Sequence, residues 1–164
     1  MIAMLAALSA CGPAGAQPEP VGASTVNASG IHPPAGWQAL PSVAAAARTA
    51  AGAGGVTVDG VEAWGDPAMG CYAVWLALHG AGGGPEALAE QILAGLAAEK
   101  VTASEVVQPG SEPVLVATLE RAPYRGKLRA RLGDGRISAL ACLANPREPL
   151  ACAAACAPLL GAVP

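Results

Sequence analysis

The cysteines constrain the fold of this chain more than any other feature. Its 164 residues hold five cysteines, and four of them lie from residue 71 onward: Cys71, Cys142, Cys152 and Cys156. The last two stand four residues apart in a segment with a helical pattern, where their Cβ atoms would be about 5–6 Å apart. A disulfide brings two Cβ atoms to about 3.5–4.5 Å. We therefore expect Cys152 and Cys156 to bond to Cys71 and Cys142 rather than to each other.

Two pairings remain, and the sequence favours one of them. A Cys142–Cys152 bond would close a short strand-to-helix connection, and a Cys71–Cys156 bond would join a central strand to the last helix. This is the predicted pairing. The alternative is a four-cysteine zinc site, but the paired C-x₂-C spacing that is typical of structural zinc does not occur. A redox C-x-x-C motif is also missing from the sequence.

The N-terminal segment indicates a compartment in which these thiols would form disulfides. Residues 1–8 are almost wholly apolar, and the sequence Leu8-Ser9-Ala10-Cys11 follows. This resembles the lipobox of bacterial lipoproteins, in which an aliphatic residue and two small residues precede a cysteine. The resemblance implies that residues 1–10 are a signal peptide and that Cys11 carries acyl chains, which anchor a protein stably when there are two or three.

The segment departs from a usual signal peptide, because no Lys or Arg precedes Cys11. The alternative is an apolar N-terminus with a chance cysteine. A membrane-spanning helix is not expected, because it would need about 20 apolar residues. Gly12 stands where an Asp would suggest retention at an inner membrane. The resemblance therefore implies anchoring in the cell envelope, at the periplasmic face of the outer membrane.

The rest of the chain divides into a tether and one domain. Residues 11–34 are rich in Gly, Pro, Ala and Ser, as flexible linkers are. Residues 35–164 are enough for a single domain. Apolar residues make up 53% of the chain and charged residues 13%, which argues against disorder. The chain has no Phe, and Ala is by far its commonest apolar residue. A core of small side chains gains modest burial energy per residue, so cross-links would help it.

The apolar patterns predict strands and helices in this domain. We expect an extended segment at 37–40 and strands at 56–61, 71–79, 101–107, 114–120, 125–132 and 136–143. We expect helices at 43–51 with Ser42 as cap, from Pro85 with Leu88, Ile92 and Leu96 on one face, and from Pro146 with Asn145 as cap, the last ended by Pro158 and Gly161. Asp59-Gly60 indicates a turn or a bulge, Gly65-Asp66-Pro67 a loop, and Asp134-Gly135 a hairpin.

This order of elements predicts an α+β fold in which helices flank an antiparallel sheet and disulfides stabilise the core. Local sequence adds a resemblance to the PsbP/Mog1-type α/β/α sandwich over roughly residues 35–160. The residues that suggest it are Gly36-Trp37, the hairpin formed by 126–128 and 135–141, and the helix that ends in Leu159-Leu160.

The strongest candidate for catalysis is His79 with the glycine-rich stretch that begins at Gly80 and ends at Gly84. It resembles the HGGG oxyanion motif of α/β-hydrolases, but no serine stands in the G-x-S-x-G elbow that such enzymes need. A dinucleotide fingerprint would need Gly or Ala where Pro85 stands. His32 lies in the tether, and each Asp stands beside Gly or Pro, as turn residues do. We therefore predict no catalytic residue, no metal site and no cofactor.

One charged stretch remains. Six basic residues lie between positions 121 and 136, against the single acid Asp134. On a strand, Lys127, Arg129 and Arg131 would share one face. One reading is a solvated face that prevents pairing at a sheet edge. The other is a surface that docks on anionic lipid headgroups, cell-wall polymer or an acidic partner. The net charge of −3 does not favour nucleic acid.

Together these features predict a non-enzymatic, lipid-anchored accessory or binding protein of the bacterial cell envelope. Its expected partners are the membrane, through the lipid on Cys11, and an envelope protein or anionic polymer. Two alternatives stay open. One is an envelope enzyme that uses His79 and the Gly80 to Gly84 loop, and the other is a lipoprotein that binds a small hydrophobic or anionic ligand between helix and sheet.

Overall fold

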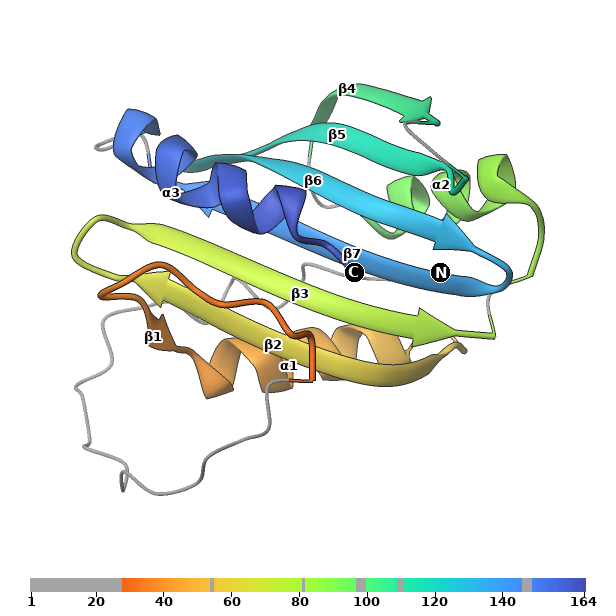
Figure 1. The fold of residues 1–164 in the computed structure, drawn as a ribbon, viewed down its shortest axis with the longest axis horizontal. Coiled ribbons are helices and arrows are strands. Elements are labelled where there is room, and N and C mark those ends of the chain that lie inside the picture. The colour runs from red at the N-terminus through yellow and green to blue at the C-terminus, as the bar shows by residue number, and fades with distance from the viewer. Residues whose placement is uncertain (1–27, 54, 81, 97–99, 109–110, 146–148) are drawn as a thin grey trace.

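The computed structural model describes residues 28–164, apart from 54, 81, 97–99, 109–110 and 146–148 (Figure 1). The strands are β1 (Gln38–Ala39), β2 (Thr57–Asp66), β3 (Cys71–His79), β4 (Lys100–Val107), β5 (Val114–Arg121), β6 (Tyr124–Gly133) and β7 (Arg136–Ala144). The helices are α1 (Pro41–Gly52), α2 (Pro85–Gly95) and α3 (Pro149–Gly161). Among these described helices, none is long and apolar enough to cross a membrane.

The seven strands form one antiparallel sheet in the order β1-β2-β3-β7-β6-β5-β4. β3 and β7 lie at its centre, which explains why the β3 sequence CYAVWLALH is apolar almost throughout: a central strand is covered on both faces. β4 to β7 follow one another as a meander, and the β3–β7 pairing joins that meander to the N-terminal strands. The predicted α+β class with an antiparallel sheet is confirmed.

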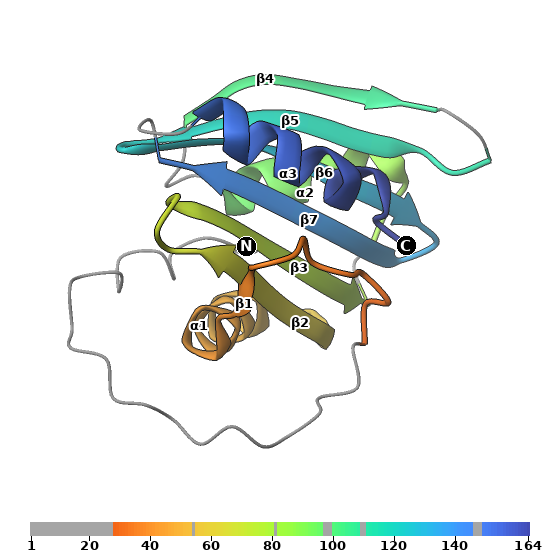
Figure 2. The same ribbon diagram turned by 60° about the vertical axis from the view of Figure 1, so that its left-hand side comes forward.

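Helices cover both faces of the sheet, as Figures 1 and 2 show. Alternate residues of β3 point to opposite faces. Leu76 and Leu78 pack in the core cluster that contains the buried side chains of α2, and Val74 packs with α1. Ala73 and Trp75 pack on the other face, in the cluster that contains the buried side chains of α3. The sheet therefore lies between α1 and α2 on one face and α3 on the other, as the predicted arrangement of helices flanking a sheet requires. Membership of the PsbP/Mog1 group stays a prediction.

Most boundaries agree with the sequence, and the turns behave as their residues predict. The register shifts between Val58 and Gly60, so Asp59 lies in a β-bulge. Gly135 adopts a φ of +67° in the β6–β7 turn, a conformation that favours glycine. One loop was misplaced: β2 continues through Gly65 to Asp66 and pairs with β3, so the turn follows at 67–70.

The helix ends were predicted less well. α1 begins at Pro41, and its cap position is Leu40 without a side-chain hydrogen bond, so Ser42 is not the cap. Pro158 lies inside α3 rather than at its end. The carbonyl of Pro158 accepts a hydrogen bond from the backbone N–H of Ala162, so the helical turn continues past the proline. The predicted start at Pro146 lies outside the described residues.

The two disulfides join α3 to the central strands, but in the opposite pairing to the predicted one. Cys71 bonds to Cys152 and Cys142 bonds to Cys156, with Cα atoms 5.5 and 6.1 Å apart. The predicted Cys142–Cys152 and Cys71–Cys156 bonds are therefore wrong. The cause is the direction of α3, which runs back along the sheet after β7. Cys71 is level with Ala144 at the end of β7, so the first cysteine of α3 meets Cys71.

The folded domain begins before residue 35, the boundary expected from the sequence. Ile31 is 1% exposed and packs with Trp37 in the cluster under α3. The hydroxyl of Ser29 donates to the carboxylate of Glu62 at 2.5 Å, and the backbone N–H of Ala28 donates to the same carboxylate at 2.6 Å. Part of the predicted tether is thus held against β2.

Candidate functional site

The predicted basic residues of β6 do share one face of the sheet. Lys127 stands directly between Thr118 of β5 and Cys142 of β7. Arg129 and Arg131 follow at two-residue steps, so all three side chains project to the face that α3 covers. Because α3 packs mainly on β7, the strand next to β6, this basic stripe lies beside the helix.

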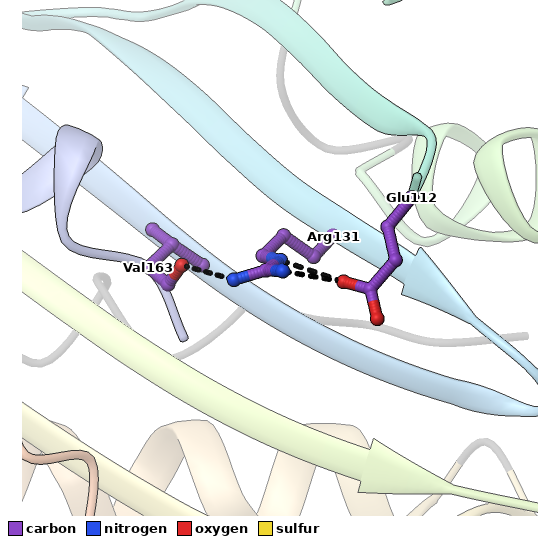
Figure 3. A network of polar contacts seen from close by, with 3 residues as sticks. All are labelled: Glu112, Arg131 and Val163. Carbon is purple, nitrogen blue, oxygen red and sulfur yellow. Dashed lines mark hydrogen bonds and ion pairs between the residues drawn. The ribbon is translucent and has the colours of Figure 1, made fainter. Parts of the chain in front are cut away.

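Arg131 is held by the protein itself. Its Nε and Nη2 atoms donate to one oxygen of Glu112 at 2.9 and 2.5 Å (Figure 3). Its Nη1 donates to the backbone carbonyl of Val163, just after α3, at 3.4 Å. A cation is favourable at a helix C-terminus, where the carbonyl groups carry partial negative charge. Arg131 therefore fastens the end of α3, and its charge is already neutralised by Glu112.

Lys127 and Arg129 are not neutralised in this way. Neither side chain has a hydrogen bond or ion pair among the described residues, and the residues opposite Arg129 are Val116 and Leu140. The Nε of Arg129 is buried without a hydrogen-bond partner. A buried polar group in that state costs about 1–3 kcal/mol. In the row of Arg129 the acid on this face is Glu105, two strands away. The residue opposite Lys127 on β5 is Thr118, with Glu120 two positions further along the strand.

Arg125 continues the stripe, and the sequence analysis missed it as a site residue. It precedes Lys127 by two positions, so strand periodicity alone places it on the same face. Its guanidinium lies 3.5 Å from Glu120, which also lies 3.8 Å from the ammonium of Lys100. The Arg125 side chain is 76% exposed, so this ion pair is weak. Arg125 therefore adds positive charge at the end of the stripe.

A groove lies between the basic stripe and α3, with a volume of about 300 Å³. Thr118, Arg125 and Lys127 form its sheet side. Its helix side consists of the small or apolar residues Pro149, Ala153, Ala157 and Leu160, and its floor includes Gly126 and the Cys142–Cys156 disulfide. An apolar hollow with a few polar groups at its rim is the usual form of a small-ligand site.

The ends of α3 add to the electrostatic character of the groove. Pro149, the first residue of the helix, lines the groove together with Arg125. The N-terminal end of a helix carries partial positive charge. This end of the groove thus combines the partial charge with the guanidinium of Arg125, which is ion-paired with Glu120. Lys127 stands further along the groove, level with Cys142, and the described residues of the lining include no acid. The site can therefore attract an anion next to an apolar surface.

A second hollow, of about 700 Å³, lies at the other end of the same face. Its lining includes the acids Asp59, Glu112 and Asp134 as well as Arg131 and Arg136. These charges have both signs and sit close to one another, so the hollow has no preference for either sign of ligand. The smaller groove is the better candidate because its charges have one sign.

His79 has a carboxylate neighbour that the sequence analysis did not foresee. Its Nδ1 lies 2.6 Å from Asp59, which the β-bulge in β2 places against the end of β3. An aspartate in this position can orient an imidazole as a general base. Among the described residues, however, no hydroxyl or thiol is hydrogen-bonded to His79. Within the described part of the chain, the pair therefore has no hydrogen-bonded nucleophile beside it.

The glycine-rich stretch after His79 serves as a strand-to-helix connection. The N–H of Gly80 donates to the carbonyl of Gly135, and the carbonyl of Gly82 accepts from the side chain of Gln91 on α2. In the part of the chain that the structure describes, no cluster of His, Cys, Asp and Glu could hold a metal ion. Cys11 lies outside the described residues.

Comparison with known proteins does not assign the chain to a family. No protein-family model matches it, and no curated protein sequence matches it.

Proposed function

We propose that this chain is a non-enzymatic, lipid-anchored binding protein of the bacterial cell envelope, and that it holds an anionic partner on the basic stripe of β6 beside α3. The observation that carries the proposal is the pair Lys127 and Arg129, two cations without an ion-pair partner among the described residues, on a strand that is paired on both sides. Binding residues on a strand are held more firmly than residues on a loop.

The charge arrangement supports binding of an anion rather than a solvated face alone. A solvated basic face usually exposes its cations fully to water, whereas Arg129 is only partly exposed and has no hydrogen bond or ion pair among the described residues. The protein as a whole has a net charge of −3, so an anion would be attracted to this stripe and not to the surface in general.

Neutralising the stripe is expected to weaken binding to a soluble polyanion. The double substitution Lys127→Gln/Arg129→Gln should lower the affinity for dextran sulfate at least tenfold at low salt, since each basic residue near an anionic surface contributes about 1 kcal/mol. The matched control compares Lys127→Gln with Arg48→Gln, which each remove one charge, the first from the stripe and the second from α1. Thermophoresis of labelled protein measures each affinity, and equal losses in the two single variants would reject the stripe as the binding surface.

The envelope location rests on two independent features. The Leu8-Ser9-Ala10-Cys11 sequence resembles a lipobox, and the four remaining cysteines pair within the domain. Two disulfides in a small domain are typical of proteins outside the cytoplasm. With Gly12 after the cysteine, the expected position is the periplasmic face of the outer membrane, where the tether would let the domain reach a partner.

The anchor can be tested by changing the single acylation candidate. Cys11→Ser should move the protein from the membrane fraction to the soluble fraction, because the acyl chains supply the membrane affinity. Ser9→Ala keeps a small residue in the lipobox and should stay in the membrane fraction. The intact mass of the unchanged protein should show cleavage before Cys11 plus added acyl mass. Wild-type protein that is soluble and retains residues 1–10 would refute the anchor.

A further inference from the structure

We infer that the groove between α3 and β6 binds an anionic amphiphile with a single alkyl chain, whose chain fills the groove and whose headgroup contacts Lys127. This inference rests on the proposed function, because it gives the anionic partner a chemical class. It goes beyond that function, since an anion alone would need only the basic stripe and not the apolar groove beside it.

The lining of the groove has the chemistry of an alkyl-chain site. Its helix side presents Ala153, Ala157 and Leu160, and its floor includes the Cys142–Cys156 disulfide, none of which offers a side-chain hydrogen bond to a polar ligand. Ala153 and Ala157 are exposed, so the hollow opens to the surface between them and the strand. Binding is favourable when a hydrocarbon chain replaces water at an apolar surface of this kind.

The volume limits the ligand to one chain. About 300 Å³ is at the lower end of the range for small-ligand pockets, roughly 300–1,000 Å³. A diacyl lipid would leave its second chain on the surface. A single alkyl chain, such as that of a lysolipid or a fatty acid, fits the available space.

The positive charge lies where a headgroup would emerge. Lys127 and Arg125 line the sheet side of the groove, and Arg129 follows Lys127 along the same face. The ammonium of Lys127 and the guanidinium of Arg125 on one rim favour a phosphate or carboxylate headgroup. The same rim disfavours a cationic headgroup by like-charge repulsion. The apolar groove therefore favours a ligand with an alkyl chain, and the cationic rim beside it favours a ligand with an anionic headgroup.

The first experiment measures binding of alkyl phosphates to the full chain with Cys11→Ser, which excludes occupation by the protein's own acyl chains. Calorimetric titration below the micelle concentration compares hexyl, octyl and decyl phosphate with inorganic phosphate and with decyltrimethylammonium. Each additional buried methylene should tighten binding by up to about fourfold until the groove is full. Decyltrimethylammonium, with the same chain and the opposite charge, should bind at least tenfold more weakly than decyl phosphate.

The second experiment blocks the groove without touching the charges. Ala153→Phe places a ring into the groove and should lower the affinity for decyl phosphate at least tenfold. Ala154→Phe is the matched control, because Ala154 is an exposed residue of the same helix that does not line the groove. Circular dichroism spectra and melting temperatures check that both variants fold, and Ala154→Phe should bind like the unchanged chain.

The outcomes separate this inference from the proposed function. If the polyanion binds as expected while affinity for the alkyl phosphates does not rise with chain length, or if Ala153→Phe and Ala154→Phe bind decyl phosphate alike, the alkyl-chain inference is wrong and the proposed function stands. If decyl phosphate and decyltrimethylammonium bind equally, the cationic rim does not select the headgroup. If neither the polyanion nor any alkyl phosphate binds, both proposals fail.

Discussion

Removing the Cys71–Cys152 disulfide with Cys71→Ala/Cys152→Ala is expected to lower the free energy of unfolding by about 4.5 kcal/mol, because the bond closes a long loop in the unfolded chain. The two cysteines are 81 residues apart in sequence, against 14 for Cys142 and Cys156. The same loop-entropy relation gives about 3 kcal/mol for the shorter loop. The total free energy of unfolding of a native protein is about 5–15 kcal/mol, so the loss of either disulfide would remove a large part of the stability.

The prediction is checked by comparing the stabilities of the two double variants. Guanidinium unfolding of Cys71→Ala/Cys152→Ala and of Cys142→Ala/Cys156→Ala should show the lower midpoint for the first. Peptide mapping without reductant should recover Cys71 linked to Cys152 in the unchanged protein. If Cys71 is recovered linked to Cys156 instead, the arrangement of α3 over the sheet is wrong.

The disulfides matter more here than in an ordinary core because α3 buries little else. Its buried side chains are Cys152, Cys156 and Leu159, and half of its other residues are alanines, nearly all of them exposed. Three side chains at this spacing lie along one helix face. Since α3 also forms one side of the groove, reduction of both bonds removes the wall against which an alkyl chain would pack. Stability and the proposed binding are therefore coupled through the same four cysteines.

Local sequence predicted the elements well because each carries its own signal. The β6–β7 hairpin follows from Asp134-Gly135, and the central position of β3 follows from its continuous apolar run. The disulfide pairing did not follow, because it depends on the direction in which α3 returns and on the register of β3 against β7. The spacing of the cysteines in the sequence determines neither property. A short connection favoured Cys142–Cys152, and the alignment of Cys71 with Ala144 decided otherwise.

For the candidate site too, the features that depend on neighbouring residues were predicted and those that depend on distant residues were not. Strand periodicity correctly placed Lys127, Arg129 and Arg131 on one face. It could not show that Arg131 is occupied by Glu112 and by the end of α3, since these groups lie 19 and 32 residues away in sequence. The groove likewise appears only when α3 is placed beside β6. The contact between His79 and Asp59 was missed because the effect of the bulge on strand register was not foreseen.

Gly126→Ala is expected to lower the free energy of unfolding by about 3 kcal/mol or more, at the upper end of the range for overpacking. A Cβ at this position would meet the carbonyl oxygen of Cys142, and would lie 2.8 Å from Cδ2 of Leu143 and 2.9 Å from the carbonyl carbon of Cys142. Two of these three atoms belong to the β7 backbone, which cannot move aside as a flexible side chain can. β6 must therefore shift away from β7 where both strands form the groove.

Gly133→Ala in the same strand is the matched control, because its Cβ would find only the carbonyl oxygen of Arg136 at 3.9 Å, an ordinary contact. Alanine also reduces the entropy of the unfolded chain, so this variant should be neutral or slightly more stable than the parent. Urea unfolding measures the difference, and recovery of Gly126→Ala only in aggregated form, with Gly133→Ala soluble, would agree with it. Equal stability of the two variants would mean that β6 and β7 are not in close contact at Gly126. The floor of the groove would then differ from the one on which the alkyl-chain inference depends.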